Sequence, residues 1–195
     1  MDPKKYIAVF CASSPKISAK YFEAATKASS AIIDAGYGII YGGGSNGLMG
    51  AVADKALELN GSVKGVIPRF MVEVEWQHKK VEDMVLVETM HQRKELMVKN
   101  STGILALPGG IGTLEELFEV LSLKKLGQYS HPVILLNTDG YFDGLIQLFK
   151  KMTDENFMRS IHNQMWSIVN TPEEIVDALK NASPWGKDAI NFAAL

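Results

Sequence analysis

Short apolar runs alternate with longer amphipathic stretches along the whole chain. Runs of the first kind predict strands at residues 6–11, 37–42, 63–68, 84–89, 103–108 and 132–137, with a shorter one at 166–170. Apolar positions at helical spacing predict helices at about 18–35, 46–60, 90–101, 113–127, 141–154 and 172–181. Strands that are apolar on both faces and separated by helices indicate a parallel sheet covered on both sides. The sequence therefore predicts a doubly wound, Rossmann-like α/β fold.

No internal repeat, low-complexity tract or linker interrupts this alternation, so we expect residues 1–195 to form a single domain. The net charge of −2 argues against a nucleic-acid platform or a polybasic membrane surface. The only cysteine has no partner for an internal disulfide and fits a reducing compartment. The apolar run at 6–11 is too short to span a bilayer. We therefore expect a cytoplasmic protein that binds neither nucleic acid nor membrane.

Three predicted strands end in unusual loops, which read CASSP (11–15), GGGSNGLMG (42–50) and PGGIGT (108–113). Ligands of parallel sheets bind at the carboxyl ends of the strands. The second loop fits G-x-G-x-x-G, but it follows the second strand, and the next strand does not end in an acidic residue, so the pattern disfavours NAD. Neither glycine loop ends in Gly-Lys-Ser/Thr, which disfavours a P-loop NTPase. Two roles remain: holding one phosphate through backbone N–H groups, or allowing close packing.

Glu116 is a carboxylate on a partly apolar helix stripe, in line with Val120 and Leu123. One role is local, because Thr113-x-x-Glu116 has the spacing of a capping box, in which the glutamate reaches back to the N-cap amide. The other role is to face a pocket.

Arg93 lies inside an apolar helical arc, three residues after Met90 and four before Met97, and Lys94 falls in the same arc. Buried cations need partners. Either both side chains reach solvent from the rim of the core, or they point into a pocket that holds an anion or Glu116. The histidines show no metal-ligand spacing, so we predict no metal. We expect no cofactor either, because neither glycine loop matches a dinucleotide or P-loop site.

The segments GGGSNGLMGAVADKAL (42–57), MHQRK (90–94) and PGGIGTLEE (108–116) together closely resemble the LOG family of cytokinin riboside 5′-monophosphate phosphoribohydrolases, often mislabelled as lysine decarboxylases. The resemblance implies hydrolysis of the N-glycosidic bond of an adenosine-type 5′-monophosphate, giving the free base and ribose 5-phosphate. It also implies that Arg93 and Glu116 are catalytic. The substrate- and phosphate-binding residues that it suggests are Ser13, Gly43, Gly44, Met90, Lys94, Gly109, Gly110, Gly112, Thr113, Glu115 and Ser122.

The resemblance further implies a homodimer whose active site lies near the subunit interface. Ser122 stands where plant members tend to have threonine, which keeps a hydroxyl, and Ala12 stands where glycine is usual. The segment after Pro68 differs from the plant form, and this region is expected near the base pocket. These departures leave the preferred base open.

Glycosidic cleavage passes through a cationic, oxocarbenium-like sugar. Glu116 is suited to stabilise that cation, hold ribose hydroxyls and orient or deprotonate water, while Arg93 would hydrogen-bond the substrate and keep Glu116 ionised. The alternatives are a broad nucleoside-monophosphate nucleosidase such as an AMP nucleosidase, or a non-catalytic nucleotide or molybdenum-cofactor carrier. A decarboxylase would need a pyridoxal-phosphate lysine, and no lysine has an evident cofactor setting.

Overall fold

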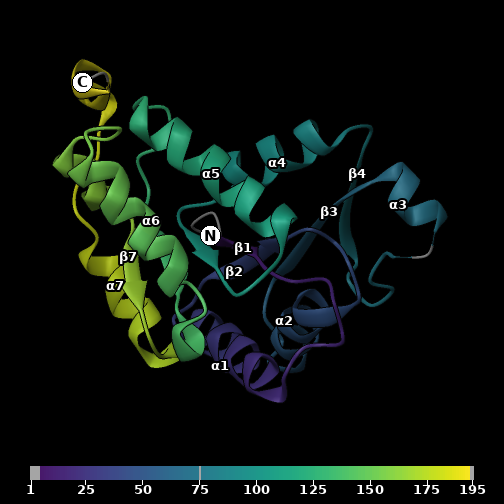
Figure 1. Cartoon of the computed structure of the whole chain (residues 1–195). Coiled ribbons are helices and arrows are strands. Elements are labelled where there is room, and N and C mark those ends of the chain that lie inside the picture. The colour runs from purple at the N-terminus through teal and green to yellow at the C-terminus, as the bar shows by residue number, and fades with distance from the viewer. Residues whose placement is uncertain (1–4, 75, 194–195) are drawn as a thin grey trace.

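The computed structural model describes residues 5–74 and 76–193, and these form a seven-stranded parallel sheet with helices on both faces (Figure 1). The strand order is β4-β3-β2-β1-β5-β6-β7. The strands are β1 (Tyr6–Phe10), β2 (Gly38–Tyr41), β3 (Val63–Pro68), β4 (Asp83–Val87), β5 (Ile104–Ala106), β6 (Val133–Leu136) and β7 (Ser167–Val169). The predicted fold class is confirmed.

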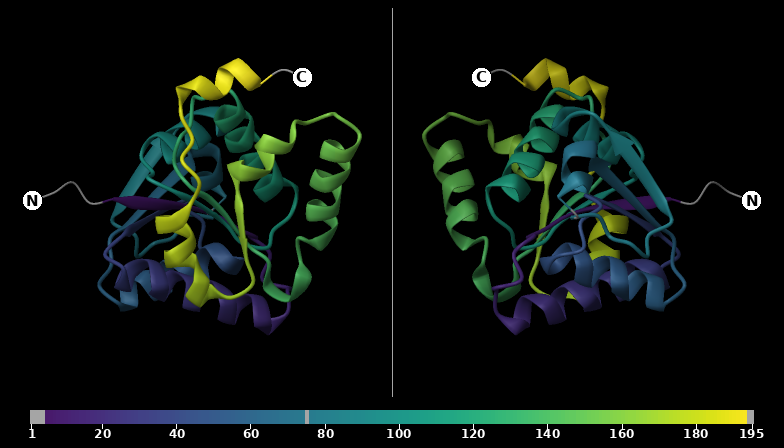
Figure 2. Two further views of the ribbon diagram at one scale, coloured as in Figure 1. Left: turned by 90° about the vertical axis from the view of Figure 1, so that its left-hand side faces the viewer. Right: turned by 90° about the vertical axis from the view of Figure 1, so that its right-hand side faces the viewer.

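Helices join the strands in chain order. They are α1 (Ala19–Asp34), α2 (Gly47–Glu58), α3 (Arg69–Glu73), α4 (Met90–Lys99), α5 (Ile111–Lys125), α6 (Asp143–Asp154) and α7 (Ile175–Asn181). Short 3-10 turns are η1 (Thr138–Gly140), η2 (Ser160–Met165), η3 (Pro172–Glu174) and η4 (Lys187–Phe192). Helices α1, α2 and α7 pack on one face of the sheet, and α4, α5 and α6 pack on the other (Figure 2). None of the described helices is long and apolar enough to cross a bilayer.

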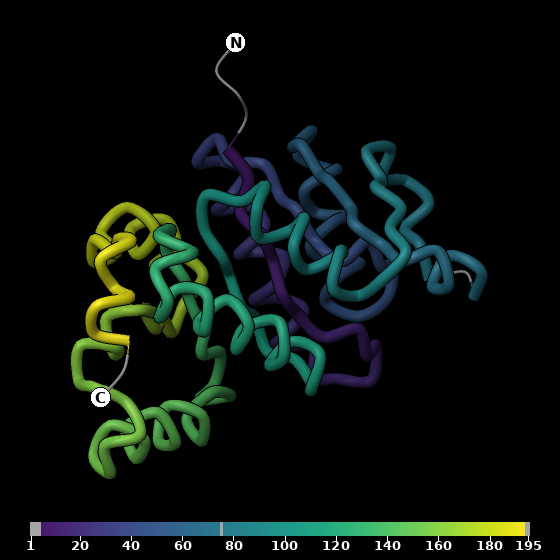
Figure 3. The backbone as a smooth tube through the Cα atoms, turned by 90° about the horizontal axis from the view of Figure 1, so that it is seen from above, coloured from purple at the N-terminus to yellow at the C-terminus, as the bar shows by residue number. Residues whose placement is uncertain are grey.

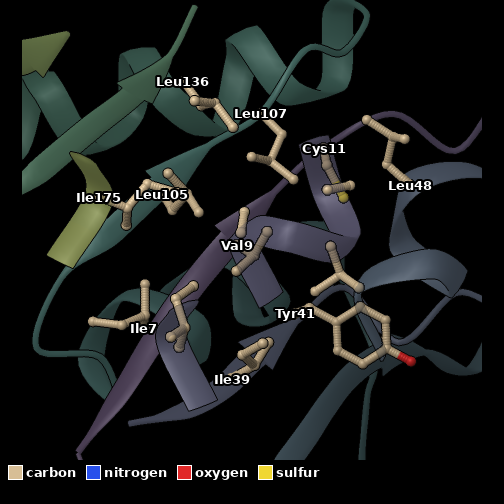
Figure 4. Packing of buried hydrophobic residues seen from close by; sticks show 14 of the residues in the cluster. Ile7, Val9, Cys11, Ile39, Tyr41, Leu48, Leu105, Leu107, Leu136 and Ile175 are labelled. Carbon is tan, nitrogen blue, oxygen red and sulfur yellow. The ribbon is translucent and has the colours of Figure 1, made fainter. Parts of the chain in front are cut away.

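Two hydrophobic clusters hold these layers together, because alternate residues of each strand point to opposite faces. On β1, Ile7 and Val9 belong to the cluster beneath α1 and α2, whereas Ala8 and Phe10 belong to the cluster beneath α4 and α5. Figure 4 shows the first cluster, with Ile7 and Val9 beside side chains from the neighbouring strands. Burial on both faces explains why the strands read as continuous apolar runs.

The strand order reverses direction at β1, which pairs with β2 on one side and β5 on the other. Seen from above, the purple segment that contains β1 runs through the middle of the molecule, between the blue part of the chain that follows it and the later green and yellow part (Figure 3). Loops that leave such neighbouring strands diverge and open a crevice at their carboxyl ends. The site is therefore expected where the loops after β1 and β5 separate.

The sequence-based bounds agree with the structure to within about three residues for the strands and the long helices. The five-residue helix α3 was not predicted, because five residues are too few to display a helical period. Helix α5 begins at Ile111, two residues before the predicted start. That shift changes the role of Glu116.

Candidate active site

A cavity of about 450 Å³ opens at the carboxyl ends of β1, β2, β3 and β5. This volume lies within the range of small-molecule sites. Loops after β1, β2 and β5 supply hydroxyls and backbone groups, including Ser13, Ser45 and Gly110. The end of β3, helix α3 and the residues that follow supply apolar side chains, including Ile67 and Met71. The cavity therefore has a polar side and an apolar side.

Arg93 and Glu116 meet in this cavity. Arg93 Nη1 donates to Glu116 Oε1 at 2.5 Å, and Arg93 Nε donates to the Val66 carbonyl at 3.2 Å. Each of the two charged side chains is 8% exposed. Of the two arrangements that the sequence allowed for Arg93, the structure has the buried one, in which the partner is Glu116. Arg93 does not reach solvent from the rim of the core.

Local structure at the start of α4 turns Arg93 inward. Thr89 is the N-cap residue, and its hydroxyl accepts a hydrogen bond from the Gln92 amide at 3.1 Å while the Gln92 side chain accepts from the Thr89 amide at 3.3 Å. This capping box fixes the first turn of α4. Arg93 and Met97, one helical turn apart, are the buried residues of this helix.

Gly42 and Gly47 of the second loop are explained by close packing, one of the two roles that the sequence allowed. A Cβ atom on Gly42 would overlap the Arg93 guanidinium, lying 2.7 Å from Cζ. Gly47 has a φ of +60°, and a Cβ there would lie 2.5 Å from the Ser13 carbonyl carbon. Both glycines therefore make room for the site.

Burial raises the pKa of Glu116 above its ordinary value of 4.5, and the Arg93 charge partly offsets this rise. Arg93 thus favours the ionised carboxylate, as expected from the sequence, but desolvation has the larger effect. A carboxylate whose pKa is raised toward neutrality is a better general base at physiological pH than an ordinary glutamate.

The turn before α5 presents backbone amides to the cavity. Gly110 is the N-cap residue of α5 and contributes no side chain, and Gly110, Gly112 and Thr113 line the cavity. The first N–H groups of a helix have no partner within the helix and favour an anion. On the other side of the turn, the Tyr141 hydroxyl donates to the Gly109 carbonyl at 2.7 Å. The Tyr141 hydroxyl therefore holds the turn on one side, while the amides on the other side face the cavity.

The predicted capping box of Thr113 and Glu116 is wrong as a local structure. Because α5 begins at Ile111, Thr113 is already in its first turn and Glu116 lies in the second, too far along to reach the N-cap amide. The Thr113 side chain instead packs on Gly109. A Cβ atom added to Gly109 would lie 2.6 Å from the Cβ of Thr113. Glu116 is thereby free to face Arg93.

Eight of the predicted site residues line the cavity, namely Ser13, Gly44, Met90, Arg93, Gly110, Gly112, Thr113 and Glu116. Gly43 and Gly109 lie in the same two loops, next to lining residues. Lys94 lies elsewhere, on a second cavity of about 550 Å³, and forms ion pairs with Glu115 and Glu119. The Ser122 hydroxyl donates to the Phe118 carbonyl at 2.8 Å, also outside the first cavity. Within one chain, Lys94, Glu115 and Ser122 therefore do not line the cavity of the Arg93–Glu116 pair.

Trp76 and Cys11 line the cavity but were not among the predicted site residues. The segment after Pro68 was expected near the base pocket. Which of its residues face the pocket could not be predicted, because the five residues of α3 are too few to show a helical period. Cys11 is buried, as expected for a small core residue at a strand end, and burial strongly raises the pKa of its thiol. Within residues 5–74 and 76–193, no group of three or more His, Cys, Asp or Glu side chains is placed to hold a metal ion.

A protein-family model described as "Possible lysine decarboxylase" matches residues 49–179. Cytokinin riboside 5′-monophosphate phosphoribohydrolase LOG5 of Arabidopsis thaliana is 37% identical over 180 residues, covering 92% of this chain and 79% of the relative. Probable cytokinin riboside 5′-monophosphate phosphoribohydrolase LOGL1 of Oryza sativa subsp. japonica is 40% identical over 166 residues, covering 85% and 74%.

Among solved structures, the molybdenum cofactor binding protein of Rippkaea orientalis superposes with a TM-score of 0.70 at 20% identity, covering 92% of this chain and 98% of that one. The molybdenum cofactor carrier protein of Chlamydomonas reinhardtii gives the same values. At this level of identity the likeness concerns the fold alone.

Proposed function

The chain belongs to the LOG family of cytokinin riboside 5′-monophosphate phosphoribohydrolases, and we propose that it hydrolyses the N-glycosidic bond of adenosine-type 5′-monophosphates. The products are the free base, a cytokinin or adenine, and ribose 5-phosphate. Relatives that carry this name match over most of their own length as well as most of this chain.

The observation that carries the proposal is the buried contact of 2.5 Å between Arg93 and Glu116, in a cavity that also contains the amino-terminal turn of α5. Helix amides suit a phosphate, and a carboxylate in the next helical turn suits the sugar to which that phosphate is attached. A binding protein would need the amides but would gain nothing from burying a carboxylate beside a nucleotide that is already anionic.

In the proposed reaction, the bond between C1′ of the ribose and the base nitrogen breaks, and its electron pair leaves with the base. The Glu116 carboxylate stabilises the positive charge that develops on the sugar. A water molecule adds its oxygen to C1′ and gives one proton to Glu116, which then returns it to solvent. The other water proton stays on the new hydroxyl, and the departing base takes its proton from solvent.

Arg93 keeps its proton throughout, because a guanidinium does not lose its proton in the pH range in which enzymes work. In the proposal it orients Glu116 through the Nη1 contact and contributes a hydrogen bond to the substrate. The Val66 carbonyl accepts from Nε and holds the guanidinium in place.

The direct test measures release of free base from AMP, isopentenyl-AMP, GMP and CMP. We expect release from the adenine nucleotides, and the ratio among the four separates a cytokinin nucleotide hydrolase from a broad nucleoside-monophosphate nucleosidase.

Glu116→Gln keeps the shape but removes the charge, and it should lower turnover by roughly 10²–10⁴, the range for a positioned acid–base group. Glu95→Gln, on an exposed position of α4, is the matched control and should retain activity. A wild-type protein that binds AMP and isopentenyl-AMP but releases the base of neither would contradict the proposal and favour a carrier.

The description "Possible lysine decarboxylase" receives no support from the cavity, because no lysine is among the described residues that line it. Pyridoxal-phosphate chemistry needs a lysine that forms a Schiff base with the cofactor. Lys94 is paired with two carboxylates, and Lys124 is buried against the carbonyls of Ser130 and His131.

We also propose that residues 1–195 work as one domain, that two copies form a homodimer with the site near their interface, and that the protein is cytoplasmic. Ile111, at the cavity rim, is 88% exposed, which favours a covering surface on that side. A dimer would bring a second copy close to this rim. The buried free thiol of Cys11 fits a reducing compartment. Sedimentation equilibrium tests the dimer, and a monomer at the concentration of the activity assay would contradict it.

A further inference from the structure

Trp76 has an unusual position for a large apolar side chain. It lines the cavity that contains Arg93 and Glu116, and it is 52% exposed. Met71 and Ile67 line the same cavity, so Trp76 belongs to its apolar side. A half-exposed indole that lines a cavity presents an apolar aromatic surface to whatever the cavity holds.

The main chain holds Trp76 against the second glycine loop. The Ser45 amide donates to the Trp76 carbonyl at 3.0 Å, and the His78 amide donates to the Gly43 carbonyl at 2.9 Å. Between them, Gly44 and Gln77 form an isolated antiparallel bridge. The Trp76 amide donates to the Met71 carbonyl at 3.1 Å, which ties the residue back to α3. Residue 76 is therefore fixed by the same loop that, with Gly42, makes room for Arg93.

The strand order defines a direction across the cavity. The amides at the start of α5 follow β5, Ser13 follows β1, Gly42 and Gly44 follow β2, and Ile67 and Met71 lie at or after the end of β3. From β5 to β3 there are three strand spacings, or roughly 14 Å at ~4.8 Å each. A nucleotide whose phosphate lies at α5 and whose sugar lies at Glu116 would therefore place its base toward β3 and Trp76.

We propose that the Trp76 indole stacks on the base of the bound nucleotide and acts as a base-binding residue. This orientation rests on the proposed function, because it takes the phosphate to lie at the start of α5. Every nucleobase has a flat face, so stacking favours a base over a solvent-filled cavity without selecting among bases by hydrogen bonds. Selectivity beyond the presence of a base then comes from Ile67 and Met71 beside it.

Intrinsic tryptophan fluorescence gives the first readout. Trp76 lines the cavity, whereas the other two tryptophans lie in the second hydrophobic cluster, away from the bound nucleotide. Trp166 contacts Phe149 with ring centroids 4.4 Å apart, and Trp185 contacts Phe192 at 5.6 Å. AMP should quench the emission of the wild-type protein saturably, whereas ribose 5-phosphate, which has no base, should not. Trp76→Phe should bind AMP without the quenching.

Kinetics give the second readout. Trp76→Ala should raise the KM for AMP by roughly ten- to a hundredfold, the usual loss for one stacked base. Because stacking is uniform binding, kcat should change little. The inhibition constant of ribose 5-phosphate should stay at the wild-type value. Trp76→Phe keeps an aromatic ring and should restore most of the affinity for AMP.

The outcomes distinguish this proposal from the proposed function. If Trp76→Ala leaves AMP affinity unchanged, or weakens AMP and ribose 5-phosphate equally, the stacking role is overturned whatever the activity. The absence of both AMP binding and quenching in the wild-type protein overturns it too. If AMP binds and quenches but no base is released, the hydrolase proposal fails, while stacking on Trp76 is supported and calorimetric dissociation constants replace KM.

Discussion

The guanidinium of Arg93 occupies the space that a side chain on Gly42 would need. A Cβ on Gly42 would lie 2.7 Å from Arg93 Cζ and 3.2 Å from Nε, closer than atoms normally approach. The second glycine loop and the buried ion pair are thus one packed unit. The absence of a side chain at residue 42 is a condition for the placement of Arg93 beside Glu116.

Gly42→Ala should therefore reduce turnover although it removes no polar group. The added methyl group displaces the guanidinium, and a misplacement of about 1 Å at a catalytic site costs roughly 10²-fold in rate. Overpacking should also lower the free energy of unfolding by about 1–3 kcal/mol. Gly144→Ala is the matched control, because Gly144 lies in α6 with nothing within 4 Å of an added Cβ. Normal kinetics in Gly42→Ala would show that Arg93 tolerates displacement.

Breaking the buried pair on one side should cost more stability than removing both charges. Arg93→Met leaves the Glu116 carboxylate buried without its cation, which should lower the free energy of unfolding by about 3–5 kcal/mol. The double variant Arg93→Met, Glu116→Gln has no uncompensated charge and should be more stable than Arg93→Met alone. Urea unfolding of the two single variants and the double variant measures the coupling. Additive losses would mean that the two groups do not act as a pair.

The pH dependence of kcat/KM should report Glu116. The carboxylate acts in its ionised form, so activity should rise with pH as Glu116 loses its proton. Because burial raises its pKa, the midpoint of this acid limb should lie above the ordinary value of 4.5. The limb should disappear in the residual activity of Glu116→Gln. A midpoint at or below 4.5 would mean that Arg93, not burial, dominates the ionisation of Glu116 in the free enzyme.

Lys124 should make stability depend on pH in the alkaline range. Burial lowers its pKa from 10.5 to about 8 in the folded protein. Between these values the unfolded chain holds a proton that the folded protein has lost, so the free energy of unfolding should rise as pH rises from about 8 to 10.5. The gain is at most about 3.5 kcal/mol, since one pKa unit corresponds to ~1.4 kcal/mol.

Lys124→Met isolates this contribution, because tyrosines also titrate near the upper end of the range. Urea unfolding of both proteins at three pH values from 7.5 to 10.5 should show wild-type stability rising relative to Lys124→Met. Parallel pH profiles for the two proteins would contradict the lowered pKa of Lys124.

The sheet could be predicted because its inner strands are buried on both faces and read as apolar runs. Arg93 and Glu116 could be singled out because each interrupts an apolar helical stripe. The start of α5 could not be placed, since Thr113-x-x-Glu116 has the spacing of a capping box. In the structure the Leu114 amide donates to the Gly110 carbonyl, so the helix has begun before Thr113.

The sequence also could not predict that Lys94 and Arg93 face different cavities. Adjacent helical residues point about 100° apart, so Arg93 and Lys94 face different neighbours. The apolar arc of α4 contained both, and the choice depends on which helix lies alongside. Glu115 and Glu119 of α5 draw Lys94 to the second cavity. The hydrophobic pattern of a single helix has no information about such neighbours.

Every hydrogen bond that ties residue 76 to the second glycine loop and to α3 uses the main-chain atoms of that residue. Its backbone would follow nearly the same course with almost any side chain attached. Natural drift or laboratory selection can therefore exchange the group presented at this point without loosening the scaffold around Arg93. In this chain, the group that faces the cavity from residue 76 can therefore change while Arg93 and Glu116 stay in place.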